Sequence, residues 1–534
     1  MHTAGPGGLW GRRSFLGALV SGLMSRPTNA APGPWSVEVT LTPRVAGATR
    51  EIVNFGVPFA PGQLADPATV RALDETGRDV GAAVRALTFW KPPPEHSGNA
   101  RTSVRSIQIQ ARLDVSRPRH LSVTTGSTVR APAPIVAVTD TLVHADGLEG
   151  PRVRAQLPSA WLCASLVAGP QTPASASGPW AGYDADVERN FPASLRYLDS
   201  DVYHHWLFDR PTVYYKQYVR TGAERFLDAA THAAHFMRVH TAFGGPTPGY
   251  FTLKGPDVKY VYPRAMHLLF ALTGDDRARD AGIVMAAYCR DHWDPVYRPE
   301  RYTEPPLGVD PEKDRAFWSP RHQAYGLLGV LHGWQLTGDA GYWRRARAYV
   351  DALAAHQAHP PDGRPADGSW RQDWALYDPN ETRLKGATSA WMTAILVDAL
   401  FEYWWLSGDA RVPGMITRWC DFLDRRGFVP DGSRAHYVID CLGDEHLDEA
   451  PGPQGQGMER HNTELAYTFA MGLYFSRSDD ERARFRRRFD RLFASAITLD
   501  ANTPERAYNW AFQASSQLVY VMGHLDSAAA PLTY

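Results

Sequence analysis

The chain has almost no net charge and no long apolar run beyond its first thirty residues. Its 534 residues include 56 basic and 57 acidic side chains, which give a formal net charge of −1. This balance provides no overall field that would attract nucleic acid or a membrane surface, so a site for a charged ligand must be local. No later segment approaches the run of about twenty apolar residues that spans a bilayer. We therefore expect neither a nucleic-acid partner nor a membrane segment in the mature chain.

Cysteine is also scarce, which excludes a disulfide-rich scaffold. The four cysteines are Cys163, Cys289, Cys420 and Cys441, and none of their spacings matches a zinc-binding pair or a short disulfide loop. Cys420 and Cys441 could meet in the fold, but separate buried thiols fit the sequence better. We expect a protein without a bound cofactor.

The first thirty residues have the organisation of an export signal. The segment Arg12-Arg13-Ser14-Phe15-Leu16 precedes an apolar run from Gly17 to Met24, and small residues follow up to Ala31. Residues 1–31 therefore resemble a twin-arginine signal peptide. This resemblance implies a protein that folds, is exported by the twin-arginine route and acts in the periplasm or outside the cell.

A turn recurs through the C-terminal two-thirds of the chain. It has the form Leu-Thr/Ser-Gly-Asp, and its glycines at 274, 338 and 408 follow Gly222 at steps of 52, 64 and 70 residues. Each turn separates an apolar segment from an amphipathic one, as expected for helical hairpins stacked into an (α/α) toroid over 201–534. One more apolar helix covers 508–522, and its outer partner could come from the Ala-rich stretch before Asp201. The predicted hairpins are 212–220 with 224–239, 263–272 with 277–289, 321–336 with 342–355, 389–405 with 413–426, and 463–475 with 481–496.

The N-terminal part of the mature chain has the period of β-strands. Residues alternate between apolar and polar over 36–42, 106–110 and 121–124, which predicts an antiparallel, sandwich-like β domain over 35–143. Residues 144–200 are rich in Pro, Ala, Ser and Gly and form a predicted linker that wraps over the toroid. Four aromatic side chains would anchor this wrap, namely Trp161, Trp180, Tyr183 and Phe191.

Part of the predicted β domain resembles a known family. The segment Phe55-Gly56-Val57-Pro58-Phe59-Ala60-Pro61-Gly62, a turn from Leu73 to Gly77 and the strand Ser103-Val104-Arg105-Ser106-Ile107 are similar to the N-terminal β domain of exo-rhamnogalacturonan lyase-like proteins. In that family this domain precedes an α/α toroid. The resemblance implies a pectic substrate that contains rhamnose and galacturonate.

The residues near the starts of the inner helices favour an acidic sugar as ligand. Helix N-termini present free N–H groups to one mouth of a toroid, and Arg, Lys, His, Tyr and Trp outnumber carboxylates there. Aromatic rings stack on sugars, and cations bind a uronate carboxylate. The catalytic candidates are His461, His322, Tyr215, Tyr214 and Lys216, and the substrate-binding candidates are Arg460, Asn462, Arg321, Arg264, His267, His205, Trp206, Trp318, Lys385, Trp391, Asn509 and Trp510.

We therefore predict an exported polysaccharide lyase that cleaves beside a uronic acid by β-elimination. This reaction needs a neutralised carboxylate and a base near the α carbon, which the candidates above could provide. A toroidal glycoside hydrolase is the first alternative, and it would use two carboxylates among Asp373, Asp378, Glu381, Glu459 and Glu464. A polysaccharide-binding protein without catalysis is the second. Asp440, Asp444, Glu445 and His446 could hold a divalent cation, although a solvated acidic loop is the simpler interpretation.

Overall fold

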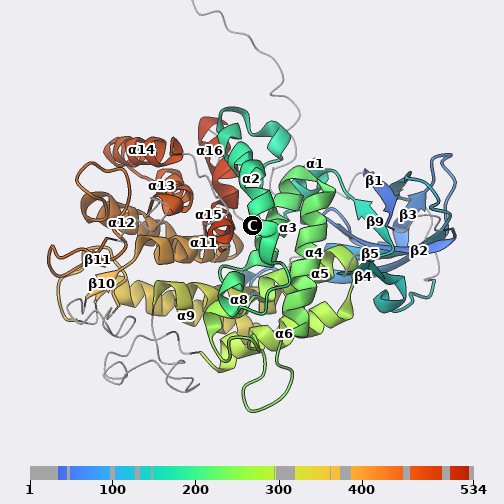
Figure 1. The fold of residues 1–534 in the computed structure, drawn as a ribbon, viewed down its shortest axis with the longest axis horizontal. Helices are drawn as coiled ribbons and strands as arrows, with labels where there is room; N and C mark the ends of the chain where they lie inside the picture. Colours follow the sequence, from blue (N-terminus) through green and yellow to red (C-terminus); the bar gives the residue numbers. More distant parts are fainter. Residues whose placement is uncertain are drawn as a thin grey trace, which may run out of the picture.

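Two small antiparallel sheets and a ring of helices make up the computed structural model (Figure 1). The structure describes residues 34–44, 49–96, 103–126, 133–145, 148–293, 295, 319–360, 362–372, 386–448, 458–495 and 506–527. The predicted signal peptide lies outside these residues. Among the helices in the described part of the chain, none has the length and apolarity needed to cross a membrane.

The β domain consists of two sheets whose strands are all antiparallel. In β1 alternation predicts the strand faces correctly, because Val37, Val39 and Leu41 are buried between more exposed neighbours. In β5 it does not, because the polar residues of 106–110 are as buried as the apolar ones. The predicted boundary at 143 is too early, since β9 pairs with β1 beyond it. The first sheet has the spatial order β3 (Val70–Leu73), β6 (Arg119–Thr125), β1 (Ser36–Pro43) and β9 (Val153–Gln156). The second has the order β2 (Glu51–Pro58), β5 (Ser103–Leu113) and β4 (Ala83–Trp90). A separate hairpin consists of β7 (Leu142–Ala145) and β8 (Leu148–Pro151).

All five predicted helical hairpins are present, and their first helices together with the helix Ala507–Gln513 form a closed inner ring in which each helix contacts the next. The inner helices are buried on nearly every side, whereas the outer ones bury one stripe, as in α14, where Phe485, Phe489 and Leu492 face inward. The inner helices are α3 (Arg210–Thr221), α5 (Pro263–Thr273), α8 (Pro320–Thr337), α11 (Ala390–Ser407), α13 (Asn462–Phe475) and α15 (Ala507–Gln513), which continues into α16 (Leu518–Ser527). Their outer partners are α4 (Glu224–Val239), α6 (Asp276–Asp291), α9 (Ala340–Ala358), α12 (Arg411–Arg426) and α14 (Asp479–Phe493).

The recurring turn joins inner to outer helices by one local mechanism. Gly274 ends α5 in the left-handed conformation, with φ of 73°, which glycine adopts without strain. The Thr273 hydroxyl bonds the Leu269 carbonyl and accepts the Asp275 N–H, while Asp275 caps α6 at the Arg277 N–H. Gly338 and Gly408 end α8 and α11 in the same conformation. The repeat in the sequence is therefore a repeated pair of helix caps.

The segment predicted as a linker supplies the sixth outer helix. This helix, α2 (Ala181–Ser194), packs on α15 through the edge-to-face pair Tyr183–Phe512, whose ring centroids are 5.6 Å apart. Trp180 packs on α14, Phe191 contacts α4, and Trp161 donates its indole N–H to the Pro58 carbonyl at 2.8 Å. All four predicted aromatic anchors therefore bury area between this segment and its neighbours.

The cysteines are free thiols in the structure. Cys163, Cys289 and Cys420 are buried, and Cys441 is half-buried. Burial raises the pKa of the Cys163 thiol to about 12, so it remains protonated at neutral pH. Separate thiols are the arrangement that the sequence favoured.

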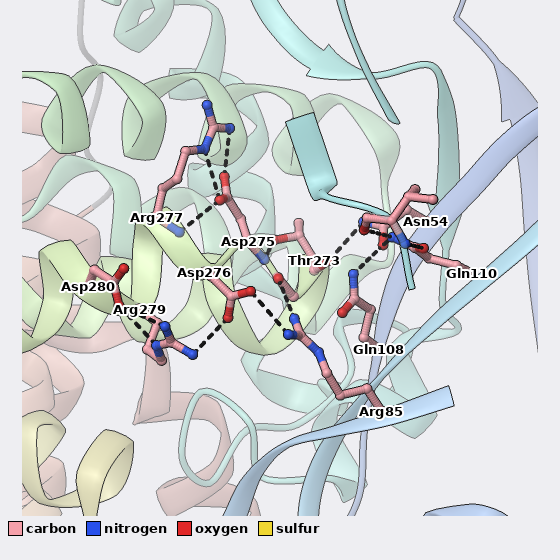
Figure 2. Close-up of polar contacts among 12 residues, drawn as sticks. Asn54, Arg85, Gln108, Gln110, Thr273, Asp275, Asp276, Arg277, Arg279 and Asp280 are labelled. Atoms are coloured by element: carbon pink, nitrogen blue, oxygen red, sulfur yellow. Dashed lines mark hydrogen bonds and ion pairs between the residues drawn. The ribbon is translucent and has the colours of Figure 1, made fainter. Parts of the chain in front are cut away.

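Side chains of the β domain cover the C-terminal end of α5 (Figure 2). Asn54 donates to the Thr273 carbonyl at 2.8 Å, and Arg85 donates to the Gly274 carbonyl and to Asp276, each at 3.0 Å. These bonds satisfy carbonyls that have no partner within the helix. Trp90 likewise contacts Trp405 near the end of α11. The β domain thus covers this end of the ring and leaves the helix N-termini at the opposite face.

We expect Gly56→Ala to loosen this junction. A Cβ at position 56 would lie 2.2 Å from the Ala271 carbonyl oxygen and 2.6 Å from the Leu272 carbonyl carbon, both backbone atoms that cannot rotate away. We predict a loss of at least about 2 kcal/mol in the free energy of unfolding, measured by denaturant titration. Gly244→Ala is the control, because no atom lies within 4 Å of its added Cβ. Equal stability of the two variants would contradict the described junction.

Candidate functional site

The face with the inner-helix N-termini carries a stack of aromatic rings, which we call the mouth. His461 lies between Trp391 and Trp510, with ring centroids 5.6 and 4.8 Å away and near-parallel planes. Tyr437 extends the stack beyond Trp391 at 5.9 Å, and Phe208 packs edge-on against both indoles. Residues from α11, α13, α15 and the start of α3 thereby meet in one cluster. Trp391, His461 and Trp510 are 5, 3 and 8% exposed, so most of each ring is covered by its neighbours, and a sugar would stack on the part that remains exposed.

Three arginines surround the aromatic rings of the mouth. The Arg321 guanidinium lies 5.1 Å from the Trp391 ring centroid, while those of Arg460 and Arg506 lie 5.5 and 5.1 Å from that of Trp510. The charges of Arg321 and Arg506 also act on the Tyr260 hydroxyl and oppose the burial that raises its pKa. Cations from three helix starts therefore converge on one region, where they could bind a carboxylate.

Tyr325 lies one helical turn below Arg321 on the same face of α8. Its side chain is 2% exposed, and its hydroxyl has no hydrogen-bond partner among the described residues. Burial and the charge of Asp209 raise its pKa well above 10, against the opposing charges of Arg321 and Arg264. The phenol therefore remains protonated at neutral pH, and the charges of two arginines and a carboxylate act on it. A buried hydroxyl without a partner costs free energy.

Asp209 reaches this group from a strained turn. Phe208 and Asp209 have φ values of 72° and 52°, in the left-handed region that non-glycine residues rarely adopt. This turn places the Phe208 ring at the mouth and the Asp209 carboxylate at the cap of α3, where it accepts the Thr212 N–H. Burial raises the pKa of Asp209 to about 6, although Arg264 and Lys216 oppose the shift. The carboxyl can therefore exchange a proton near neutral pH.

A network of buried charges runs down the ring axis below these residues. Arg264 of α5 donates to Asp398 at 2.9 Å and also to Glu402, and both carboxylates come from α11. Lys216 of α3 lies 3.8 Å from Asp398, and His332 of α8 lies 3.0 Å from Glu402. Burial lowers the pKa of Lys216 to about 8, against the effect of Asp398. The network fixes the Arg264 guanidinium, whose charge acts on both Tyr325 and Asp209.

The mouth and axis contain many, but not all, of the predicted residues. Arg321, Trp391, Arg460, His461 and Trp510 form the mouth, while Lys216, Arg264 and His267 lie in the axis. His461 bonds Glu464 through Nδ1, and burial together with Arg460 and Arg506 lowers its pKa to about 3. The imidazole is therefore neutral at pH 7.

His322 and the two asparagines lie at the edges of this region. The His322 ring stacks on Trp293 at 5.2 Å, and its Nε2 lies 3.7 Å from Asp257. Asn462 donates to the Ser433 carbonyl, and Asn509 donates to the Leu207 carbonyl at 3.1 Å. Asn509 therefore holds the strained turn before α3 in place.

Four predicted site residues point elsewhere. The Tyr214 hydroxyl donates to the Ser194 carbonyl of α2, and the Tyr215 hydroxyl is affected by Thr231 and Asp275, so both side chains face the outer ring. Trp206 is completely buried against Phe236, and His205 bonds Ser200 in the same turn. These four side chains pack the fold and do not line the mouth. Trp318 and Lys385, with the alternative carboxylates Asp373, Asp378 and Glu381, lie outside the described residues.

The remaining acidic candidates have local partners. Glu459 pairs with Arg434 at 3.3 Å. Asp440 accepts the N–H groups of Leu442 and Glu445, and its own N–H donates to His446. In the part of the chain that the structure describes, no group of three or more His, Cys, Asp or Glu residues could hold a metal ion.

The sequence contained signals for the residues that were missed. Asp398 and Glu402 are acidic residues in the middle of an otherwise apolar helix, four positions apart, so they share one face. A charge in such a helix must be paired or functional. Tyr325 follows Arg321 by one turn and shares its face in the same way.

Comparisons with known proteins find distant structures only. No family model and no curated protein matches the chain. It is similar to an unsaturated glucuronyl hydrolase from Bacillus sp. GL1, with 14% identity, 60% of this chain and 85% of that one covered, and a TM-score of 0.41. It is also similar to a polysaccharide lyase, with 12% identity, 66% of this chain and 100% of that one covered, and a TM-score of 0.45. A glycosyl hydrolase family 88 protein from Bacteroides vulgatus has 13% identity to it, with 65% of this chain and 99% of that one covered, and a TM-score of 0.39. With identities this low and each TM-score below 0.5, these similarities assign no function to the chain.

Proposed function

We propose that the chain is an exported enzyme that degrades an acidic polysaccharide by β-elimination beside a uronic acid. The observation that carries this proposal is the convergence of three arginines and an aromatic stack above the unpartnered hydroxyl of Tyr325. A neutral polysaccharide would not require three cations at the mouth, whereas a uronate carboxylate would.

The arginines would act on the charge that develops during elimination. Removal of the proton α to the uronate carboxylate places negative charge on that carboxylate, and the C–O bond at the β carbon then breaks. Arg321 would bind the carboxylate at the mouth, with Arg264 fixed below it by Asp398 and Glu402. Because these guanidinium groups are held before the substrate arrives, they need little reorganisation during the reaction.

His461 and Tyr325 would transfer the protons. The imidazole is neutral at pH 7 and bonds Glu464 through Nδ1. Burial raises the pKa of the Glu464 carboxyl well above 4.5, so Nε2 would accept a proton once substrate binding leaves Glu464 ionised and Nδ1–H donates to it. A carboxylate bound beside Arg460 and Arg506 would offset two of the causes that lower the pKa of His461. Tyr325, whose hydroxyl remains protonated, would donate to the leaving oxygen.

Hydrolysis is the second candidate, and the environment of Asp209 favours it. A carboxyl group with its pKa raised to about 6 is suited to protonate a glycosidic oxygen in mildly acidic solution. A second buried carboxylate, Asp398, faces the same axis and is held by Arg264 and Lys216. A general acid and a second carboxylate are the groups that glycoside hydrolysis uses.

The test is to incubate the protein, without residues 1–31, with polygalacturonate, rhamnogalacturonan, glucuronan, alginate and glycosaminoglycans. Elimination leaves a double bond conjugated to the uronate carboxylate, so a rise in ultraviolet absorbance would support the lyase and identify its substrate. New reducing ends without that absorbance would support hydrolysis. Neither signal with any member of the panel would contradict both candidates.

A further inference from the structure

We propose that Tyr203 and Lys254 form a second sugar-binding subsite on the rim of the mouth. It would hold a unit of the same acidic chain at a distance from the bond that is cleaved. This inference rests on the proposed function, because it extends the same binding surface outward. It predicts that the natural ligand is longer than a disaccharide.

Tyr203 is an exposed aromatic side chain on a rigid support. Its side chain is 40% exposed, although it begins the short 3-10 turn η7 (Tyr203–Trp206) whose last residue is completely buried. Trp206 stacks on Phe236 at 4.2 Å and donates its indole N–H to the Ser200 carbonyl at 2.8 Å. The backbone below the exposed ring is thus fixed from within. A sugar could stack on a surface that loses little conformational freedom on binding.

Positive charge lies beside this ring. The Lys254 ammonium is 5.4 Å from the Tyr203 ring centroid, and the Lys259 ammonium is 5.8 Å from that of Tyr260. Both lysines share a single carboxylate, Asp257, at 3.8 and 2.7 Å. Two ammonium groups with one carboxylate leave a net positive charge, so the patch favours an anionic sugar over a neutral one.

Tyr260 connects this patch to the mouth. The ring centroids of Tyr203 and Tyr260 are 5.6 Å apart in an edge-to-face contact. Tyr260 ends the turn η8 (Val258–Tyr260), which packs on α8, and His322 of α8 lies 3.7 Å from Asp257 at the start of that turn. Tyr203 and Lys254 therefore lie beside a turn that packs on the helix carrying Arg321. A chain with one unit in the mouth could place a later unit over Tyr203.

The inference is tested by affinity gel electrophoresis of Tyr203→Ala, Tyr203→Phe and the unaltered protein in gels that contain each polysaccharide of the panel. We expect at least one polysaccharide to retard the unaltered protein and Tyr203→Ala to weaken its binding about three- to tenfold, the range for loss of one aromatic stacking contact. Tyr203→Phe keeps the ring and should bind normally. Phe89→Ala is the matched control, because Phe89 is similarly exposed, at 38%, but lies on β4 of the β domain.

Normal retardation of Tyr203→Ala, or no retardation of the unaltered protein by any polysaccharide, would overturn the subsite. Binding that depends on Tyr203 without turnover would support the subsite and contradict the enzymatic proposal, so the two failures are distinguishable. If a substrate is turned over, Tyr203→Ala should lower the kcat/KM for long chains. The kcat/KM for the shortest oligosaccharide that the enzyme cleaves should not change. An equal loss at both lengths would indicate a structural defect and would also overturn the subsite.

Discussion

Replacing Tyr325 with phenylalanine is expected to reduce turnover by at least about a hundredfold while leaving the fold as stable as before. The hydroxyl is the group that would protonate the leaving oxygen, and loss of a general acid costs about 10²- to 10⁴-fold in rate. The hydroxyl has no partner in the described residues and the ring is 2% exposed, so phenylalanine fills the same space and loses no hydrogen bond. Rate assays and denaturant titrations of the same preparation measure both effects.

Tyr215→Phe is the matched control for this prediction. Tyr215 is equally buried, but its hydroxyl lies beside Thr231 and faces the outer ring. We expect this variant to retain both turnover and stability. Full activity of Tyr325→Phe, or a comparable loss in Tyr215→Phe, would remove Tyr325 from the catalytic group.

The variant D209N is expected to be more stable than the unaltered protein at neutral pH and nearly inactive. Burial raises the pKa of Asp209 from 3.8 to about 6, so the folded state binds this proton more tightly than the unfolded chain does. The stability that protonation provides is complete below pH 4 and is lost as the pH rises to about 6. An amide imitates the protonated acid at every pH, and it remains a good helix cap.

The size of this effect follows from the two pKa values. A difference of about two pKa units corresponds to about 3 kcal/mol of unfolding free energy, which D209N should gain at pH 7 and not at pH 3.5. Turnover should fall at least about a hundredfold, because the carboxyl either exchanges a proton with Tyr325 or protonates the glycosidic oxygen itself. Denaturant titrations at both pH values and rate assays measure these changes. Normal turnover with unchanged stability would reduce Asp209 to a helix cap.

Local rules in the sequence were sufficient to predict the ring. At Gly274, Gly338 and Gly408 a glycine ends the inner helix, and the aspartate that follows it accepts a backbone N–H at the start of the outer helix. Such caps depend on adjacent residues only. The β domain was also predicted, but its last strand was not. β9 is four residues long and half-buried, so its sequence has little alternation, and its place beside β1 is fixed by tertiary contacts.

The candidate residues were predicted to gather at the N-termini of the inner helices, and the structure brings only some of them together. Successive residues of a helix point about 100° apart, so naming Tyr214, Tyr215 and Lys216 together combined one residue that faces the axis with two that do not. Asp209 lies at the start of an inner helix but was not selected as a site candidate, because its orientation depends on a strained turn that no local pattern indicates. The partners Asp398 and Arg264 are 134 positions apart in the chain, so their contact follows from ring closure alone.

The most direct test of the proposed site is a crystal structure of Tyr325→Phe with an acidic oligosaccharide from the panel. We predict a uronate carboxylate within hydrogen-bonding distance of the Arg321 guanidinium, with a sugar ring against Trp391 or Trp510 and the scissile oxygen next to the ring of residue 325. An oligosaccharide bound only on the β domain or on the outer helices, with the mouth unchanged, would contradict the assignment of the mouth as the active site.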